Sequence, residues 1–361
     1  MKIDIIAGAR PNFMKIAPII EAIKNYQTQK TSLSYRLIHT GQHYDKNMSD
    51  DFFTQLGIPK PDVNLEVGSG TQAEQTANIM IRYEKLLLEK SSDICLVVGD
   101  VTSTMACSIV AKKLGVKVVH VEAGIRSFDL TMPEEINRMV TDSITDYFFT
   151  TSEYANENLK KAGIEDKRVF YVGNTMIDTL LKQMPKFIKP AVFDELNLKP
   201  QKYFVMTMHR PANVDEAEKL QEFLNTIESN VNGCPVLFPV HPRTANILKD
   251  MGLEFNSIYQ IPPMSYLEFN YLVKHAKCVI TDSGGITEET TVMGVPCMTL
   301  RDNTERPETI NEGTNELIGT NPQSLIPALK ILFNGDWKKG SIPHLWDGKT
   351  ADRIIKNLID L

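Results

Sequence analysis

The sequence predicts an α/β protein of two doubly wound, Rossmann-like domains, each built on a parallel sheet. Short apolar runs rich in β-branched residues alternate with longer amphipathic segments along the whole 361-residue chain. This alternation is typical of βαβ units, whose parallel strands are buried on both faces. The length also favours two cores over one, because a domain usually holds about 100–200 residues.

The apolar runs give the expected strands in chain order. In the first domain they are Ile3–Ile6, Tyr35–His39, Ile94–Val98, Val116–Val121, Tyr147–Thr150 and Val169–Val172. In the second domain they are Tyr203–Met208, Val236–Val240, Ser257–Gln260, Cys278–Thr281 and Cys297–Leu300. Helical patterns such as Ala73–Leu88 and Met105–Leu114 lie between them at the lengths expected of crossover connections.

The domain boundary is expected in a proline-containing segment without a strong strand. We predict an N-terminal domain over 1–173, a hinge over 174–202 and a C-terminal domain over 203–345, with the active site in the cleft between the domains. The amphipathic stretch 346–361 is expected to form a helix that could pack back on the first domain.

Composition and charge exclude several classes of protein. The net charge of −6, from 39 basic and 45 acidic residues, gives no basic field for nucleic acid. No run is apolar and long enough to span a membrane, and the first residues do not read as a signal peptide. Five cysteines without a pairing pattern suit a reducing cytoplasm. The histidines and cysteines lack the spacing of a metal site.

Two glycine-containing segments that follow strands are candidate phosphate sites, because ligands of open α/β sheets bind beyond the carboxyl ends of strands. In the segment 8–15, Arg10 and Lys15 are either an anion site or two solvated cations beside a turn. In the segment 281–289, Ser283, Gly284 and Gly285 can present backbone N–H groups to a diphosphate at a helix start. Glu289, one turn later, suits the hydroxyls of a ribose. The alternative for this second segment is an ordinary capped helix.

A third segment competes with these two. Gly68–Ala73 matches the G-x-G-x-x-G/A pattern of dinucleotide oxidoreductases. The preceding run Val63–Val67 alternates with polar residues, unlike a buried parallel strand. The next strand also ends well beyond the spacing expected for a ribose-binding acid, so this interpretation is the weaker one.

Four acid–base groups follow strands or lie in nearby loops: Asp100, Glu122, Glu134 and His209. Each alone is more often a cap, a turn residue or a structural histidine. Together they form the kind of set that proton abstraction and leaving-group stabilisation require.

Several motifs resemble the bacterial non-hydrolysing UDP-N-acetylglucosamine 2-epimerases. They are Gly8–Pro11, Gly41–His43, Gly99–Thr104, His120–Arg126, Pro133–Arg138, Thr281–Glu289 and Thr304–Glu308, and their order covers nearly the whole chain. The resemblance implies the GT-B architecture. It also implies a cofactor-independent isomerase that interconverts UDP-N-acetylglucosamine and UDP-N-acetylmannosamine through elimination of UDP to 2-acetamidoglucal and its re-addition.

The resemblance assigns roles residue by residue. Asp100, Glu122 and Glu134 match the catalytic carboxylates, and His209 matches a histidine near the diphosphate. Lys15 and Arg10 resemble the cations of the first domain, Ser283, Gly284 and Gly285 the diphosphate loop, Glu289 the ribose acid and Arg306 the arginine on the uridine side. The loop at Pro262-Pro263-Met264 matches the place where the family holds the uracil. The family further implies a cytoplasmic homodimer that supplies cell-surface polysaccharide synthesis.

The resemblance leaves regulation and substrate open. Gln42 and His241 stand where some members have a regulatory UDP-N-acetylglucosamine site, but their neighbours depart from that pattern. The segments 41–51 and 68–76 look closer to 2-epimerases of UDP-2,3-diacetamido-2,3-dideoxyglucuronate. Such a substrate would need a cation for its C6 carboxylate, and Arg126 and Arg138 are either that cation or partners of Glu134 and Glu135. A GT-B glycosyltransferase and a non-catalytic nucleotide-sugar sensor are the alternatives from other classes.

Overall fold

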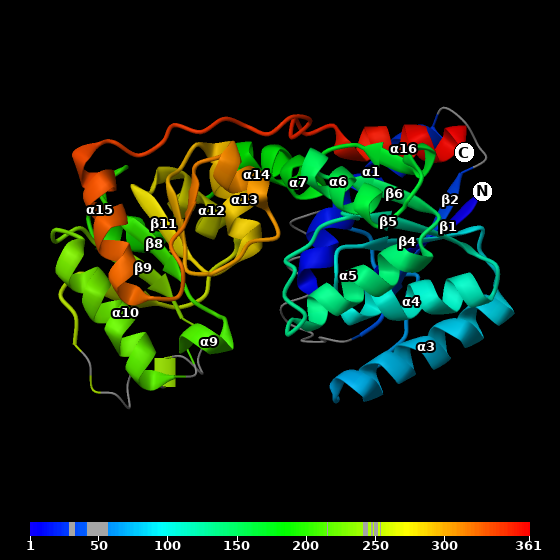
Figure 1. Cartoon of the computed structure of the whole chain (residues 1–361), viewed down its shortest axis with the longest axis horizontal. Helices are drawn as coiled ribbons and strands as arrows, with labels where there is room; N and C mark the ends of the chain where they lie inside the picture. Colours follow the sequence, from blue (N-terminus) through cyan, green and yellow to red (C-terminus); the bar gives the residue numbers. More distant parts are fainter. Residues whose placement is uncertain are drawn as a thin grey trace. The chain divides into compact units, whose positions relative to one another are not determined.

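The computed structural model describes residues 1–28, 33–41, 57–214, 216–240, 245–246, 248, 252 and 254–361, and for Arg10, Pro211 and Ala212 only the backbone. The chain divides into two units (Figure 1). Unit 1 comprises Met1–Thr179 and His344–Leu361, and unit 2 comprises Leu180–Pro343. The predicted regulatory residues Gln42 and His241 lie outside the described residues. No described helix is both long and apolar enough to cross a membrane.

Unit 1 contains a seven-stranded parallel sheet in the order β3-β2-β1-β4-β5-β6-β7. Its strands are β1 (Lys2–Ala7), β2 (Ser34–His39), β3 (Val63–Asn64), β4 (Ile94–Val98), β5 (Lys117–Val121), β6 (Tyr147–Thr150) and β7 (Val169–Tyr171). Its helices are α1 (Arg10–Gln27), α3 (Gln72–Glu89), α4 (Thr102–Lys113), α5 (Pro133–Ile144), α6 (Glu153–Lys161) and α16 (Thr350–Asp360). Helix α7 (Thr175–Gln183) runs from unit 1 into unit 2. The strand order reverses direction between β1 and β4.

Unit 2 contains a six-stranded parallel sheet in the order β10-β9-β8-β11-β12-β13. Its strands are β8 (Phe204–Thr207), β9 (Val236–Pro239), β10 (Ile258–Ile261), β11 (Cys278–Thr281), β12 (Cys297–Thr299) and β13 (Asn315–Leu317). Its helices are α8 (Ala191–Glu195), α9 (Pro211–Val214), α10 (Ala217–Asn230), α12 (Tyr266–His275), α13 (Gly284–Met293), α14 (Pro307–Asn311) and α15 (Leu325–Asn334). Here the order reverses between β8 and β11.

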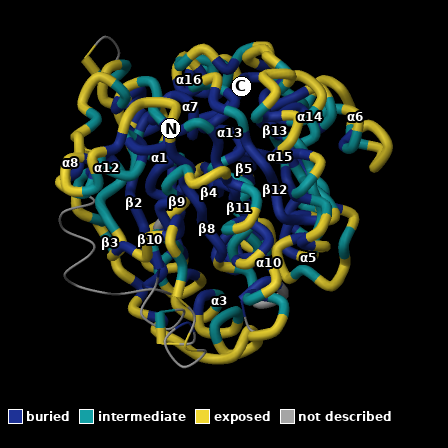
Figure 2. The backbone as a smooth tube through the Cα atoms, turned by 90° about the vertical axis from the view of Figure 1, so that its left-hand side faces the viewer, coloured by how far each residue is buried: buried dark blue, intermediate teal, exposed yellow. Residues whose placement is uncertain are grey.

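Each sheet is covered on both faces, which explains why its central strands are mostly apolar and buried. Alternate residues of β8 point to opposite faces: Phe204 and Met206 pack with residues of α10 and α15, whereas Val205 packs with residues of α12. In unit 1, helices α3, α4 and α5 form one row, and α1 and α16 pack together on the other side of the sheet (Figure 1). The strands are accordingly buried, and the exposed residues gather on loops and outer helix faces (Figure 2).

The predicted α/β class is confirmed, and every predicted strand is present with ends that differ by at most one residue. Two strands were not predicted, β3 and β13, and both are edge strands of two or three residues. So short a strand leaves too few residues for an apolar run to be recognised. The C-terminal helix α16 belongs to unit 1, where it packs against α1.

Candidate functional site

The site residues of unit 1 come from loops that follow β1, β4 and β5, the strands beside the reversal of strand order. In doubly wound sheets this is where ligands bind. After β1, the Asn12 side chain accepts hydrogen bonds from the backbone N–H groups of Gly8 (3.1 Å) and Ala9 (3.0 Å). Its amide Nδ2 donates to the Val98 carbonyl oxygen at 2.9 Å. Asn12 thus fastens the start of α1 to the end of β4.

Lys15 and Glu122 meet at this place. The Lys15 Nζ atom lies 2.5 Å from Glu122 Oε2, and the Glu122 side chain is only 2% exposed. Gly99, at the end of β4, has a φ of +69°. A Cβ on Gly99 would lie 3.1 Å from Lys15 Nζ and 3.5 Å from Glu122 Oε2. The glycine therefore lets both charged groups approach the loop that carries Asp100.

Glu122 itself has a φ of +68°, in the left-handed region that residues with a Cβ rarely adopt. Such strain is found mainly at functional sites, where the surrounding structure holds the residue in place. The buried carboxylate beside a lysine and the strained backbone both set Glu122 apart from an ordinary turn residue.

Asp100 is held by an arginine of α5. Its Oδ2 atom accepts hydrogen bonds from Arg138 Nε (2.9 Å) and Nη2 (2.5 Å), and Asn137 Nδ2 donates to the Asp100 carbonyl oxygen at 2.9 Å. The Asp100 side chain remains 27% exposed, so solvent and ligands can reach it. Arg138 thereby orients Asp100 without covering it.

The neighbouring glutamates 134 and 135 have different surroundings. Glu135 is buried, accepts the backbone N–H groups of Ser127 (2.9 Å) and Phe128 (3.1 Å), and pairs with Arg138 at 2.7 Å. Glu134 lies exposed in the first turn of α5. The alternative partners proposed for the two arginines are thus only partly found: Arg138 pairs with Glu135 and Asp100, but Arg126 pairs with Asp142 at 2.7 Å.

The site residues of unit 2 follow β8 and β11, the strands at its own reversal of strand order. His209 is exposed, and its backbone N–H donates to both oxygens of Asp282 at 3.0 and 3.1 Å. The Arg210 N–H (2.9 Å) and Asn213 Nδ2 (3.1 Å) donate to the same carboxylate. Asp282 is buried, so it works as an anchor that joins the two loops. Asp282 lies within the predicted phosphate-binding segment 281–289, but the sequence did not indicate this anchoring role.

The loop from Ser283 to Gly285 opens helix α13. Ser283 occupies the N-cap position, but its side chain makes no capping hydrogen bond, contrary to the alternative of an ordinary capped helix. A Cβ on Gly284 would lie 2.8 Å from Glu305 Oε1, whereas a Cβ on Gly285 would meet nothing within 4 Å. The first turn of the helix therefore has open space beside it and backbone donors that its cap residue leaves unsatisfied, as an anion site requires.

Glu289 lies on α13, and Arg306 directly precedes α14. Glu289 Oε1 accepts a hydrogen bond from the Tyr266 hydroxyl at 2.6 Å, and burial raises the pKa of Glu289 to about 7. Arg306 is buried and its Nε donates to Glu288 Oε1. The two residues assigned to the nucleoside thus belong to a buried polar group under α13 and α14.

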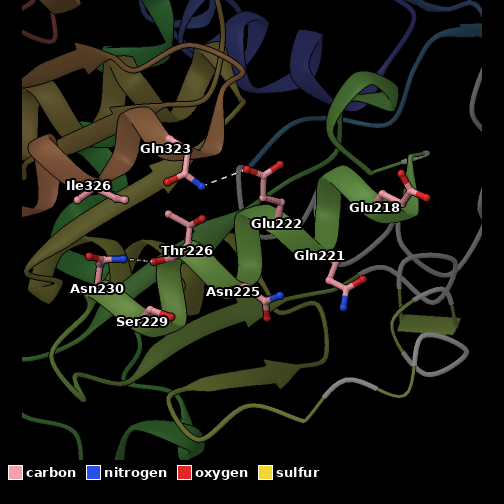
Figure 3. Close-up of a pocket in the computed structure, with 9 residues that line it drawn as sticks. All are labelled: Glu218, Gln221, Glu222, Asn225, Thr226, Ser229, Asn230, Gln323 and Ile326. Carbon is pink, nitrogen blue, oxygen red and sulfur yellow. Dashed lines mark hydrogen bonds between the residues drawn. The ribbon is translucent and has the colours of Figure 1, made fainter.

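Two hollows mark the surface of unit 2. One, of about 820 Å³, is lined by residues 190–196 and 258–268 and includes the predicted uracil loop at Pro262–Met264. The other, of about 480 Å³, runs along α10 and carries polar side chains such as Glu222, which accepts a hydrogen bond from Gln323 (Figure 3). None of the predicted site residues lines the hollow on α10.

The segment that matches the dinucleotide pattern occupies a different position. Gly68–Ala73 follows β3, the edge strand of the sheet in unit 1, and leads into α3 through a capping box in which Thr71 and Glu74 bond each other's backbone. An edge strand is not a point where the strand order reverses. The described residues contain no group of three or more His, Cys, Asp or Glu arranged to hold a metal ion.

Comparisons with known proteins give the family. The model of the family described as UDP-N-acetylglucosamine 2-epimerase matches residues 25–359. The UDP-N-acetylglucosamine 2-epimerase of Methanocaldococcus jannaschii is 42% identical, with 99% of each chain covered. The UDP-2,3-diacetamido-2,3-dideoxy-D-glucuronate 2-epimerase of Pseudomonas aeruginosa is 40% identical, with 88% of each chain covered.

Solved structures agree with these matches. The crystal structure of the M. jannaschii UDP-GlcNAc 2-epimerase in complex with UDP-GlcNAc and UDP covers all of both chains with a TM-score of 0.87 and 42% identity. Both sheets are thus those of GT-B-like enzymes with two Rossmann-like domains. The chain belongs to the UDP-N-acetylglucosamine 2-epimerase family, which is a family of isomerases.

Proposed function

We propose that the chain interconverts UDP-N-acetylglucosamine and UDP-N-acetylmannosamine. The observation that carries the proposal is the buried Lys15–Glu122 pair beside Asp100, at the reversal of strand order in a unit whose fold is that of the family. A carboxylate paired with a cation next to the loop that carries Asp100 supports proton transfer beside a departing phosphate.

The reaction proceeds by elimination and addition, because the C2 hydrogen has no neighbouring carbonyl to make it acidic. One carboxylate removes the C2 proton while the C1–O bond to UDP breaks, and the electron pair of the C–H bond forms the C1=C2 double bond of 2-acetamidoglucal. UDP then re-forms the bond to C1, and a proton is delivered to the opposite face of C2. Asp100, Glu122 and Glu134 are the proposed acids and bases.

The proposed nucleotide ligands divide into three groups. The N–H groups of Ser283, Gly284 and Gly285, with His209, Lys15 and Arg10, stabilise the charge that develops on the diphosphate. Glu289 accepts the ribose hydroxyls, and Arg306 lies on the uridine side. The Ser283 side chain makes no capping hydrogen bond to the start of α13, so the backbone N–H groups there remain available. This supports their assignment to the diphosphate.

The reaction needs no redox cofactor, since elimination and re-addition leave the oxidation state of the sugar unchanged overall. The proposal is tested by proton NMR of UDP-N-acetylglucosamine incubated with the purified chain in deuterated water, without NAD and with a chelator. Deuterium should enter C2 of both epimers. Epimerisation with the original hydrogen fully retained would contradict the elimination route, and a requirement for NAD would restore the dinucleotide interpretation.

A second candidate substrate is UDP-2,3-diacetamido-2,3-dideoxyglucuronate, favoured by the 40% identity to the P. aeruginosa enzyme that is named for it. The pairing of Arg126 with Asp142 and of Arg138 with Asp100 and Glu135 weighs against it. Those two cations are neutralised within the protein, whereas the C6 carboxylate would need one. Kinetics on both nucleotide sugars decide, and a strong preference for the uronate would reverse our choice.

We further propose a cytoplasmic homodimer that supplies polysaccharide synthesis. Large apolar side chains are exposed along α3 and around α5: Ile81, Leu88, Phe128, Leu130, Ile136 and Met139. Helix α4 contacts both α3 and α5, so these helices lie side by side in unit 1. Exposed apolar groups of this kind mark interaction surfaces. Sedimentation should give a dimer that Ile136→Glu with Met139→Glu converts to a monomer, and a monomeric parent would contradict this proposal.

A further inference from the structure

A buried histidine lies behind the two carboxylates that the preceding proposal places at the reaction. His120 belongs to β5, and its side chain is fully buried. The Nδ1 atom lies 2.7 Å from Asp142 Oδ1, and the Nε2 atom lies 2.8 Å from the carbonyl oxygen of Gly99. Both ring nitrogens of His120 therefore face an oxygen atom.

These contacts determine where the protons of the ring must be. A backbone carbonyl can only accept, so Nε2 must carry a proton. Asp142 Oδ2 already accepts the Gly124 N–H at 3.1 Å and lies 2.7 Å from Arg126 Nη1, which suits an ionised carboxylate. Burial by itself would raise the pKa of Asp142, but the charges of His120 and Arg126 lower it below its ordinary value. Nε2 therefore donates to the Gly99 carbonyl while Nδ1 faces the Asp142 carboxylate, so the ring bridges these two groups.

The network joins the two loops that carry the proposed catalytic acids. The Gly99 carbonyl, which His120 holds, directly precedes Asp100, and the Gly99 N–H donates to the Val121 carbonyl at 3.0 Å. Gly124, which Asp142 holds, lies two residues after Glu122. A Cβ on Gly124 would lie 2.4 Å from the Ala155 carbonyl oxygen, so this loop has little room to shift. His120 and Asp142 thus connect the loop after β4 to the loop after β5.

We propose that His120, together with Asp142, is a positioning residue that fixes the Asp100 and Glu122 loops in the geometry needed for proton transfer at C2. This inference rests on the proposed epimerase function. Its physical basis is geometric. When a catalytic carboxylate is displaced by about 1 Å, the rate of the reaction can fall by about 100-fold, because the reacting atoms no longer meet at the correct distance. The buried network holds the backbone of both loops, while the Asp100 side chain stays 27% exposed and Glu122 stays buried beside Lys15.

The kinetic test compares His120→Gln and Asp142→Asn with the parent. A glutamine side chain carries both of its donor hydrogens on one nitrogen, so it cannot bridge the two oxygens that face different ring nitrogens of His120. We expect kcat to fall by about 10- to 100-fold, while KM and the Kd for UDP change by less than about threefold. Unchanged kcat in both variants would overturn the proposal.

A matched control separates positioning from general destabilisation. Asp4 is buried in β1 of the same unit and pairs with Arg36 at 2.6 Å, near the amino end of the sheet rather than the carboxyl end. Asp4→Asn should lower the unfolding midpoint and leave kcat unchanged at temperatures where the chain is folded. An equal loss of kcat in Asp4→Asn would show that loss of stability alone explains the effect, which would also overturn the proposal.

The hydrogen bonds of the ring are tested without any activity measurement. In the ¹⁵N NMR spectrum of histidine-labelled protein, the signals that vanish in His120→Gln should show a proton on Nε2 that exchanges slowly with solvent, because it donates to the buried Gly99 carbonyl. An Nε2 proton that exchanges as fast as that of an exposed histidine would contradict the proposal even if the chain is an active epimerase. Conversely, an inactive parent chain with a protected Nε2 proton would refute the proposed function and leave the hydrogen-bond network in place.

Discussion

The Lys15 ammonium lies 2.5 Å from the Glu122 carboxylate, so a cation from α1 and an acid from the loop after β5 share one point at the carboxyl end of the sheet in unit 1. Both side chains are largely buried, which makes their interaction stronger than that of an exposed pair. A pair of this kind can keep a carboxylate ionised in a buried place and can also stabilise negative charge on a departing phosphate.

The first prediction tests Glu122 and Lys15 as one unit. Glu122→Gln should lower kcat by at least about 100-fold, the usual scale for the loss of a positioned acid or base, with little change in the Kd for UDP. Adding Lys15→Met to this variant should lower kcat little further, because residues in contact do not act additively. Lys15→Met should also weaken UDP binding measured by calorimetry. A normal kcat in folded Glu122→Gln would refute the catalytic assignment.

The second prediction separates Glu134 from Glu135. Glu134 is exposed, so Glu134→Gln should leave the unfolding midpoint within experimental error and lower kcat by about 100-fold. Glu135 holds two backbone N–H groups and Arg138, so Glu135→Gln should lower the free energy of unfolding by about 1–3 kcal/mol. Thermal unfolding and steady-state kinetics of both variants provide the check. A Glu134→Gln enzyme with normal turnover would remove Glu134 from the mechanism.

The third prediction concerns Arg306, whose Nε donates to the buried Glu288. Arg306→Ala should weaken UDP binding and also destabilise unit 2, because it leaves a buried carboxylate without its cation. Arg306→Ala combined with Glu288→Gln should regain most of the stability but not the affinity. If the double variant binds UDP as tightly as the parent, Arg306 acts on the fold and not on the nucleotide.

The fourth prediction uses Asp178, which accepts the N–H groups of Thr350 (3.1 Å) and Ala351 (2.7 Å) at the start of α16. Burial raises its pKa to about 6, so the folded chain holds this proton more tightly than the unfolded chain. The resulting stability is fully present below the unfolded pKa of about 4 and is lost as the pH rises through about 6, a change of about 2–3 kcal/mol.

The measurement compares the parent with Asp178→Asn, whose side chain does not titrate. The chain has two tryptophans, so Trp337→Phe leaves Trp346, which is buried in unit 1, as the reporter of urea unfolding. Between pH 4 and pH 7 the parent should lose stability relative to Asp178→Asn. Parallel pH profiles would show that Asp178 does not titrate in this range.

The sequence predicted the buried strands well because short apolar runs, separated by amphipathic segments of crossover length, rarely form anything but the strands of a parallel sheet. It also placed Asp100 and Glu122 after strands, and those strands, β4 and β5, are neighbours in the sheet. Glycine, serine and acidic residues after β11 likewise indicated the open start of α13, although only the structure shows that Ser283 does not cap it.

The contacts that sequence reasoning missed are made between different elements of the fold. The pairing of His120 with Asp142 depends on how α5 is rotated against β5, and the pairing of Asp282 with the His209 loop depends on the adjacency of β8 and β11. Neither leaves a local signature, because each partner alone looks like an ordinary strand-end or helix residue. Arg126 illustrates the same limit. It pairs with Asp142, although Glu134 and Glu135 are nearer to it in the sequence.

The last prediction concerns Glu289 and the pH dependence of nucleotide binding. Burial raises its pKa to about 7, so the carboxylate changes from about 10% ionised at pH 6 to about 90% at pH 8. An ionised carboxylate accepts both ribose hydroxyls, whereas a protonated one must direct its own proton elsewhere. UDP affinity measured by calorimetry should therefore rise by up to about tenfold from pH 6 to pH 8, and Glu289→Gln should abolish that part of the rise.

Glu308 is the matched control, because burial also raises its pKa to about 7 while it lies on α14. Glu308→Gln should retain the rise, and the ionisation of UDP itself contributes equally to every variant. If Glu289→Gln keeps the same pH dependence as the parent, the ribose is held by another group.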